Sequence, residues 1–265
     1  MVEFIVIVES GADARTATKL AERILVEKVD WLDDDNLQYF FHWSGLQNGT
    51  QHSDWSNVNQ IIEEAKALGY KPARFLGHPK DGVPYQEYGA KADKVLKLVR
   101  FLQKTRQIRA ILLIVDLDNK PERRKGFDQA RSVHINRQPK LEIVIGTADR
   151  MREAWVLNGF IPSNQEEEQI LEEIKSELKF DPCIESHRLR GKDDIRDPKE
   201  VVKKLTDKNM EREQQCWEDT SLELLRERGI HTGLTDYIRE VEQRLIQIIL
   251  SSGDNNTHTA TTPEP

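Results

Sequence analysis

Runs of consecutive apolar residues mark the positions where buried β-strands are predicted. The three strongest runs are Phe4 to Val8, Ile111 to Val115 and Leu141 to Ile145. Because they lack the alternation of a half-exposed strand, they are typical of parallel strands that are covered on both faces. Leu37 to Trp43 has the composition of a further strand, and Phe75 with Leu76 that of a brief one.

Between these runs, apolar residues recur three and four positions apart, which is the spacing of amphipathic helices. The predicted helices are Asp13 to Lys28, Val58 to Leu68 and Glu87 to Thr105. Ser10 or Asp13 can cap the first helix, and Gly69 is placed to end the second. Residues 44–57 and 78–85 have loop composition. Strands that alternate with helices predict an α/β fold with a mostly parallel sheet flanked by helices.

After about residue 160 the pattern becomes helical, with no convincing strand. The predicted helices are Gln165 to Leu178, Pro198 to Asp207, Glu213 to Arg228 and Leu234 to Leu250. We therefore expect an α/β domain over residues 1–160 and an α-helical C-terminal appendage over residues 161–250. Residues 251–265 are poor in apolar residues and rich in Thr, Asn and Pro, so a disordered tail is expected there.

Composition limits the classes of protein to consider. With 265 residues, 37% of them hydrophobic, the chain can bury a sizeable core. A net charge of −7 argues against a protein whose main task is to coat nucleic acid. No apolar run approaches the length that spans a bilayer, and the first run lacks the flanks of a signal peptide, so no membrane contact and a cytoplasmic location are expected. Cys183 and Cys216 are far apart, which indicates neither a disulfide framework nor a zinc site.

Carboxylates directly follow two of the predicted strands. Glu9 ends the first run, and Asp116 and Asp118 follow the second. Alternate side chains of an extended chain share a face, so the two aspartates are expected to point the same way at the carboxyl end of their strand, where α/β proteins bind ligands. Carboxylates held this close repel one another unless a cation lies between them, and hard oxygen ligands suit Mg²⁺ or Mn²⁺. The alternative is a polar loop in which Asp118 or Asn119 caps a helix.

Two further carboxylates follow the third predicted strand. Asp149 and Glu153 stand four residues apart in the stretch from Asp149 to Leu157, where one helical face would carry both. They would add to the acids already gathered at the carboxyl ends of the strands. The alternative is that they stabilise the helix dipole, a contribution of about 0.3 to 1 kcal/mol.

Basic residues are concentrated just after the aspartate pair. Between residues 120 and 140, seven lysines and arginines stand against one glutamate and one aspartate. A second basic stretch, residues 184–197, lies between predicted helices. The candidates for contact with phosphate are Lys120, Arg123, Arg124, Lys125, Arg190 and Lys192. A solvated helix face and a solvated linker remain the alternatives.

The motifs VIVESGADA, around Glu9, and LIVDLDN, around Asp116, resemble the signature of the TOPRIM-domain family of topoisomerases, primases and OLD-family nucleases. REAWVLNGF is similar to a segment of small stand-alone TOPRIM-like proteins related to OLD nucleases. DPKEVVKKL and HTGLTDYIREVEQRL resemble the helical C-terminal part of those proteins. The resemblance covers about residues 3–250 and implies a TOPRIM-like sheet.

The resemblance implies a metal-dependent nuclease, or a nuclease subunit, that acts on phosphodiester bonds of DNA or RNA. In its catalytic site Glu9 is a general base or metal-linked acid, Asp116 and Asp118 are metal ligands, and Glu153, with Asp149, holds a second ion. Mg²⁺ or Mn²⁺ is the implied cofactor. The implied partners are nucleic acid and an ABC-type ATPase of a bacterial or phage defence system, and a homo-oligomer is a further expectation.

Two other functions would use the same residues. A non-catalytic TOPRIM-like scaffold or regulatory partner of an ATPase is favoured by the charged helices and the acidic net charge. A nucleotide phosphohydrolase needs the same carboxylates in a closed pocket. The chain departs from topoisomerases and primases because it shows neither a separate domain with a cleaving tyrosine nor a template-binding module. The spacing between Glu9 and Asp116 is also long.

Overall fold

The computed structural model describes residues 1–72, 78 and 82–257. Within them, five strands form one sheet in which every pairing is parallel. The strands are β1 (Val2–Val8), β2 (Phe41–Ser44), β3 (Ser53–Asp54), β4 (Ile108–Asp116) and β5 (Glu142–Ala148). Their order is β2-β1-β4-β5, and β3 pairs with the last residues of β1. The predicted α/β class and the mostly parallel sheet are confirmed.

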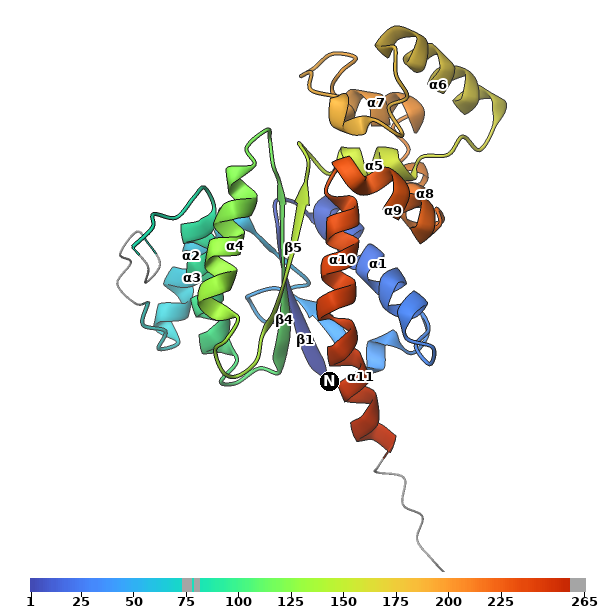
Figure 1. Ribbon diagram of the computed structural model, residues 1–265. Coiled ribbons are helices and arrows are strands. Elements are labelled where there is room, and N and C mark those ends of the chain that lie inside the picture. Colours follow the sequence, from blue (N-terminus) through green and yellow to red (C-terminus); the bar gives the residue numbers. More distant parts are fainter. Residues whose placement is uncertain (73–77, 79–81, 258–265) are drawn as a thin grey trace, which may run out of the picture.

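The central strands are buried on both faces, as their continuous apolar sequences predict. Every residue from Phe4 to Val8 in β1 is fully enclosed, and so is every residue from Ala110 to Leu113 in β4. Helices pack in two groups, one on each face of the sheet (Figure 1). The first group is α2 (Val58–Ala67), α3 (Gly89–Leu102) and α4 (Glu122–His134), and the second is α1 (Gly11–Lys28) and α10 (Leu234–Arg244).

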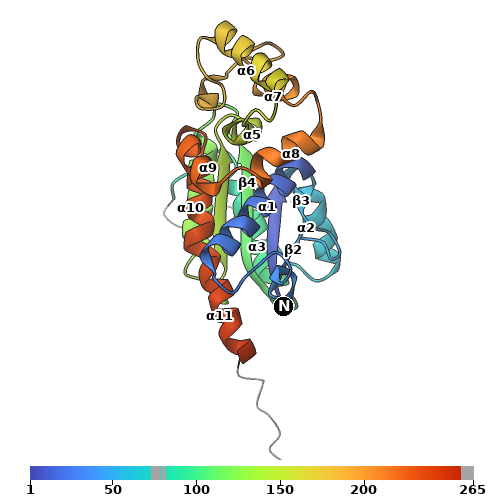
Figure 2. The same ribbon diagram turned by 90° about the vertical axis from the view of Figure 1, so that its right-hand side faces the viewer.

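The remaining helices are α5 (Glu153–Gly159), α6 (Gln165–Leu178), α7 (Pro198–Leu205), α8 (Met210–Glu218), α9 (Leu222–Arg228) and α11 (Ile246–Thr257). Figures 1 and 2 show α5 to α9 grouped beyond the carboxyl ends of the strands, whereas α11 projects from the opposite end. This helical group therefore lies at the sheet edge where α/β proteins bind ligands.

The C-terminal helices share a core with the sheet, which differs from the appendage expected from the sequence. α10 packs on β5 and α1. Trp155 of α5 stacks on Tyr237 of α10 with ring centroids 5.2 Å apart, and the Tyr237 hydroxyl donates to the Ala17 carbonyl in α1 at 2.7 Å. The physical reason is that both faces of a parallel sheet need a helical layer, and the first 160 residues supply only α1 to this face.

Several predicted elements have different ends in the structure. Leu37 to Trp43 is not one strand, because a 3₁₀ helix occupies Leu37–Tyr39 before β2 begins. Residues 44–57, expected as a loop, contain β3 and a second 3₁₀ helix. The helix predicted over Glu213 to Arg228 is divided, because Ser221 caps α9 by accepting from a backbone amide one turn later, at 3.3 Å.

Other predictions fall at the limits of the described residues. The brief strand predicted at Phe75 and Leu76 lies outside them. α11 ends at Thr257, within the stretch 251–265 where a disordered tail is expected. Among the described residues, no helix combines the length and the apolarity needed to cross a lipid bilayer.

Candidate functional site

Four carboxylates gather at the carboxyl edge of the sheet, and we call Glu9, Asp13, Asp116 and Glu153 the acid cluster. Asp116 ends β4, Glu9 follows β1, Asp13 lies in the first turn of α1, and Glu153 begins α5. Loss of hydration raises the pKa of the Asp116 carboxyl well above its usual range, and the negative charges of Asp13, Glu9 and Glu153 raise it further. Asp116 Oδ1 accepts a hydrogen bond from the Arg152 amide at 2.9 Å. Asp116 is therefore the electrostatic centre of the site.

Glu9 is held by a tyrosine that the sequence patterns do not indicate. The Tyr88 hydroxyl donates to Glu9 Oε1 at 2.9 Å. Burial raises the pKa of the Glu9 carboxyl, and this hydrogen bond opposes the increase. The Tyr88 ring packs edge-on against Trp55 and Phe127, with centroids 5.5 and 5.7 Å away. Tyr88 has a φ of 65°, a strained conformation that this packing maintains.

A close approach of α3 and α4 places Tyr88. Gly126 of α4 lies against the start of α3, and a Cβ at Gly126 would stand 2.6 Å from the Gly89 amide nitrogen. No side chain fits at this contact, so position 126 requires glycine. Glu87, just before α3, also binds Arg123 of α4 at 3.0 Å. The turn that carries Tyr88 is thereby fixed beside the sheet edge.

Asp13 is the member of the acid cluster that the sequence patterns missed. From the sequence it is expected only as a helix cap, but the cap is Ser10. Ser10 Oγ accepts from the Asp13 amide and donates to Asp13 Oδ2 at 2.9 Å. An acid in the first turn of a helix, four residues after Glu9, is the sequence signal that could have identified it.

Asp118 does not share a strand face with Asp116. β4 ends at Asp116, and Asp118 lies in the following turn with a φ of 48°, so the alternation of an extended strand no longer applies. Its side chain is 51% exposed and pairs with Arg123 at 2.8 Å. The expected geometry of the aspartate pair was therefore wrong, although the Asp118 charge still raises the pKa of Glu9.

Asp149 and Glu153 do not lie on one helical face, because α5 begins only at Glu153. The Asp149 amide donates to the Thr232 carbonyl at 2.8 Å. The Asp149 carboxylate pairs with Arg190 at 3.3 Å. Of the two acids predicted after the third strand, Glu153 belongs to the acid cluster, whereas Asp149 is paired with Arg190 outside it.

Arg152 brings a positive charge into the acid cluster. Its buried guanidinium lies 3.6 Å from Asp13 and 3.5 Å from Glu153, and it pairs with Glu213 of α8 at 2.7 Å. Burial by itself would lower the pKa of Arg152, but the Glu153 and Glu213 carboxylates outweigh it, and the pKa is raised. A helix of the C-terminal region therefore takes part in the electrostatics of the site.

Four of the six predicted phosphate contacts are engaged with carboxylates, and three of these four lie in α4 or just before it. Lys120 and Arg123 both bind Glu87, at 3.3 and 3.0 Å. Arg124 binds Glu240 of α10 at 3.1 Å, an ion pair that links α4 to the helix layer on the other side of the sheet. Arg124 therefore has a structural contact in addition to any role in binding.

The other predicted phosphate contacts differ in their surroundings. The Arg190 guanidinium donates to Asn119 as well as to Asp149, so it bridges the turn after β4 and the turn after β5. Lys125 and Lys192 form no ion pair with any residue that the structure describes. No carboxylate of the described structure competes with a ligand for these two lysines.

The acid cluster suits a hard divalent cation by charge and by ligand type. Its donors are carboxylate oxygens, which Mg²⁺ and Mn²⁺ prefer. In the part of the chain that the structure describes, the four carboxylates outnumber the one guanidinium, that of Arg152, which contacts only Asp13 and Glu153 among them. Within residues 1–72, 78 and 82–257, however, no three His, Cys, Asp or Glu side chains already stand close enough together to hold an ion.

In comparisons with protein-family models, curated proteins and solved structures, none matches this chain. Membership of the TOPRIM family therefore stays a prediction.

Proposed function

We propose that this chain hydrolyses phosphodiester bonds in nucleic acid with Mg²⁺ or Mn²⁺, as a TOPRIM-like nuclease or nuclease subunit. The observation that carries the proposal is a buried carboxyl among other carboxylates: burial raises the pKa of Asp116, and the charges of Asp13, Glu9 and Glu153 raise it further. Strongly perturbed carboxyls at the carboxyl edge of a parallel sheet are typical of functional sites.

Glu9, Asp13, Asp116 and Glu153 would hold the cation. A bound divalent ion supplies two effects in phosphodiester hydrolysis, a lower pKa of the attacking water and stabilisation of the charge on the leaving oxygen. Its positive charge would also relieve the repulsion that raises the pKa of Asp116.

The chain's own groups would orient the site. Tyr88 fixes the Glu9 carboxylate through the hydrogen bond of 2.9 Å, so Glu9 can accept a proton from a defined direction. The Arg152 amide fixes one oxygen of Asp116 and leaves the other available. Lys125 in α4 supplies an unpaired positive charge for phosphate within the described structure.

A non-catalytic scaffold is the second candidate, and Arg152 is the observation that favours it. This guanidinium already contacts two members of the acid cluster, so it gives part of the compensation that a metal ion would give. In that case the cluster would serve to hold α8 against the sheet through Glu213. An ATPase partner, self-association and a nucleotide substrate are further predictions of the sequence.

Hydrolysis of single- and double-stranded DNA and RNA in Mg²⁺ or Mn²⁺ tests the proposal. The native chain is compared with Asp116→Asn and Glu9→Gln, and with Glu63→Gln, an exposed acid of α2, as the matched control. Cleavage is expected in the native chain and the control and is expected to fall at least about a hundredfold in the two site variants. Cleavage by neither metal, or cleavage that survives both site substitutions, would refute the nuclease and favour the scaffold.

A further inference from the structure

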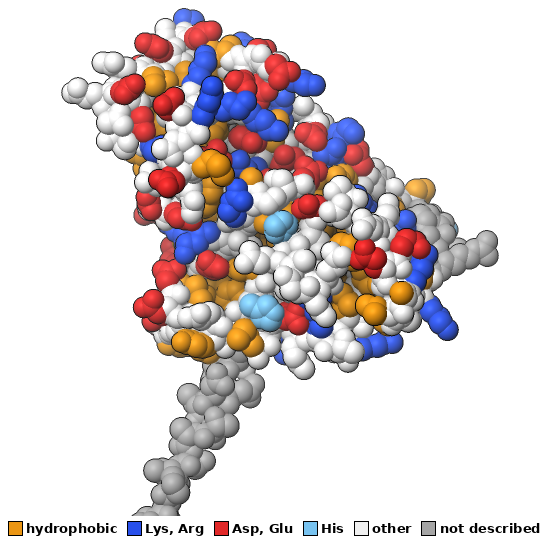
Figure 3. All heavy atoms as spheres, turned by 180° about the vertical axis from the view of Figure 1, so that it is seen from behind, with side chains coloured by type: hydrophobic (Ala, Val, Ile, Leu, Met, Phe, Trp, Pro, Cys, Tyr) orange, Lys and Arg blue, Asp and Glu red, His pale blue; other side chains and the backbone are white. Residues whose placement is uncertain are grey.

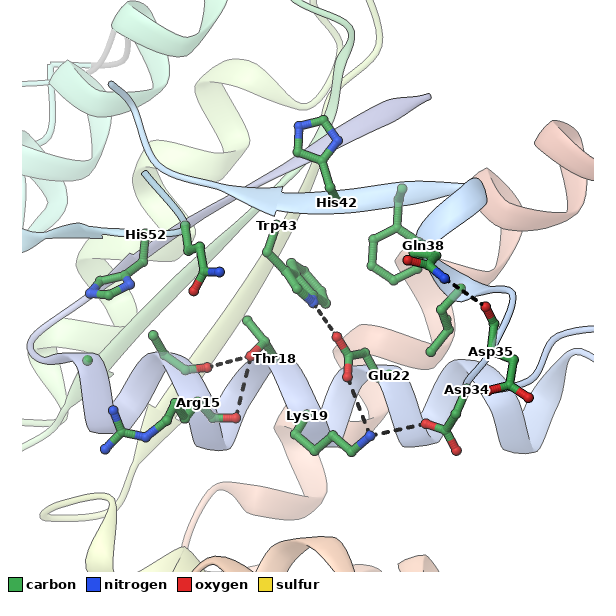
Figure 4. Close-up of a pocket in the computed structure, with 15 residues that line it drawn as sticks. Arg15, Thr18, Lys19, Glu22, Asp34, Asp35, Gln38, His42, Trp43 and His52 are labelled. Carbon is green, nitrogen blue, oxygen red and sulfur yellow. Dashed lines mark hydrogen bonds and ion pairs between the residues drawn. The ribbon is translucent and has the colours of Figure 1, made fainter. Parts of the chain in front are cut away.

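A groove of about 740 Å³ runs along the outer side of α1. One wall is formed by α1 itself and the other by residues 34–43 and 51–52 (Figure 4). The groove begins at Gly11, two residues after Glu9, so one end of it lies at the start of α1, the helix whose first turn carries Asp13 of the acid cluster. Its volume falls in the range of sites that enclose much of a small ligand, about 300 to 1,000 Å³.

The end next to the acid cluster is suited to an anion. A Cβ on Gly11 would stand 3.7 Å from His52 Nε2 and 3.8 Å from Arg15 Nη1, so these two side chains flank the bare backbone of Gly11. The Arg15 guanidinium forms no ion pair with any residue that the structure describes. An exposed, unpaired guanidinium is a ready partner for a phosphate group, and the His52 imidazole beside it has its Nε2 3.7 Å from Asp54 Oδ1.

The far end of the groove has a different character. Lys19 is neutralised there by Asp34 at 3.1 Å and Glu22 at 3.7 Å. The Trp43 indole points toward α1 and donates to Glu22 at 2.7 Å (Figure 4). This end therefore offers carboxylate oxygens and an aromatic ring in place of free positive charge. Glu22 is seven residues after Arg15, which is about 10 Å along the helix at a rise of 1.5 Å per residue.

We propose that this groove binds one nucleotide unit of a single strand of nucleic acid, next to the phosphodiester bond at the acid cluster. Arg15 and His52 contact its phosphate, and the base lies toward Trp43, with its amino groups facing the carboxylates. This inference rests on the proposed function, because it places the groove on the path of the same substrate.

A single strand fits the groove better than a duplex. Only unpaired bases expose the ring faces and edges that an aromatic ring and carboxylates can contact. Duplex binding draws mainly on a broad row of basic residues along both phosphate backbones. Figure 3 shows acidic and basic side chains interspersed on the face that it displays, without a large basic area.

Fluorescence anisotropy of a labelled single-stranded oligonucleotide, measured in EDTA so that no cleavage occurs, tests the inference. The native chain is compared with Arg15→Glu and with Arg239→Glu, an exposed arginine of α10 outside the groove that gives the same change in net charge. We expect Arg15→Glu to weaken binding about tenfold relative to the control and to reduce the salt dependence by about one phosphate contact. Arg15→Lys should retain part of the affinity, and equal melting temperatures confirm that all variants fold.

Three results would overturn the inference: no binding of the single strand by the native chain, equal affinities of Arg15→Glu and Arg239→Glu, or tighter binding of the matching duplex. The outcome is separate from that of the cleavage assay. Arg15-dependent binding without any cleavage would refute the hydrolytic function and keep the groove. Cleavage that does not depend on Arg15 would keep the hydrolytic function and refute the role of the groove.

Discussion

Asp116 occupies a position that favours ligand binding over stability. Its carboxyl has lost hydration and is surrounded by three other carboxylates. A charge in such a place costs folding free energy unless a proton or a cation compensates for it. Active sites often carry this kind of local instability, because their charged groups lack a partner until the ligand binds.

Asp116→Asn is therefore expected to stabilise the metal-free protein at pH 7. Asparagine keeps an oxygen that can accept from the Arg152 amide but removes the charge. Because the folded-state pKa of Asp116 is raised, ionisation lowers stability above the unfolded pKa of about 3.9 and has no such effect below it. In urea unfolding in EDTA, the free energy of unfolding of Asp116→Asn should exceed that of the native chain by about 0.5 to 2 kcal/mol at pH 7. The difference should vanish at about pH 3.5. A loss of stability at pH 7 would contradict this picture of the site.

Tyr88→Phe tests whether the tyrosine orients Glu9. The substitution keeps the aromatic packing against Trp55 and removes only the hydroxyl that donates to Glu9. We expect Mn²⁺ affinity, measured by calorimetry, to fall about tenfold, as for other groups that orient metal ligands. Tyr39→Phe, at an exposed position, is the control and should change nothing. Unchanged affinity in Tyr88→Phe would show that the hydroxyl is not needed.

Single residues of the site were predictable only where a strand end identifies them. Glu9 and Asp116 follow from apolar runs that stop at an acid. Tyr88 and Arg152 do not, because their contacts with the acid cluster depend on how the start of α3 and the start of α1 lie at the sheet edge, which no local pattern records. Asp118 was identified from the sequence, but its predicted position was wrong. The chain turns after β4, so the alternation of side chains along a strand does not extend to Asp118.

At the scale of elements, α3 and α4 form a unit that is closed by buried polar groups. His134 Nε2 and Asp93 Oδ1 lie 2.9 Å apart and both side chains are almost fully buried, while Lys97 donates to Asp93 Oδ2 at 2.6 Å. Burial lowers the pKa of His134. Burial would raise the pKa of Asp93, but the hydrogen bonds from His134 and Lys97 outweigh it and the pKa is lowered.

Acid should therefore weaken the packing of α3 on α4. A histidine whose folded-state pKa is lowered stabilises fully above its unfolded pKa of about 6.5, and this contribution is lost as the pH falls below that value. The free energy of unfolding of the native chain should decrease between about pH 7 and pH 5, and His134→Gln, which cannot titrate, should show a smaller decrease. Equal slopes in the two proteins would refute a role for His134 in acid sensitivity.

The existence and type of most elements were predictable, and their ends were not. Continuous apolar runs identified β1, β4 and β5, because a strand buried on both faces has no polar positions. The segment Leu37 to Trp43 also has the composition of a strand, yet a 3₁₀ helix takes its first half. β3 has only two residues and becomes a strand through its pairing with β1, so its own sequence carries no signal.

At the scale of the whole molecule, the C-terminal helices complete the α/β fold. α10 supplies much of one helical layer through Tyr237 and its neighbours. Arg23 of α1 donates to the carbonyls of Trp217 and Thr220, which holds the end of α8 against the first helix. The amphipathic patterns predicted these helices, but the surface that each apolar face covers is a tertiary property.

A chain that ends at residue 160 is expected not to fold. It would lack α10, so β5 and the buried side of α1 would be exposed to water, and Arg152 would lose its partner Glu213. Circular dichroism and urea unfolding should show no cooperative transition for this fragment, in contrast to the full chain. A cooperative transition in the fragment would mean that the first 160 residues are an independent domain after all.

Calorimetric titration of the protein with Mn²⁺ is the sharpest test of the metal site, because it asks whether the acid cluster holds a divalent cation without depending on a substrate or a partner. Native chain and Glu63→Gln are expected to bind the ion, and Asp116→Asn is expected to lose binding while its fold persists. Absence of binding in the native chain, or equal binding in Asp116→Asn, would contradict the metal site and leave Arg152 as the cation of a structural cluster.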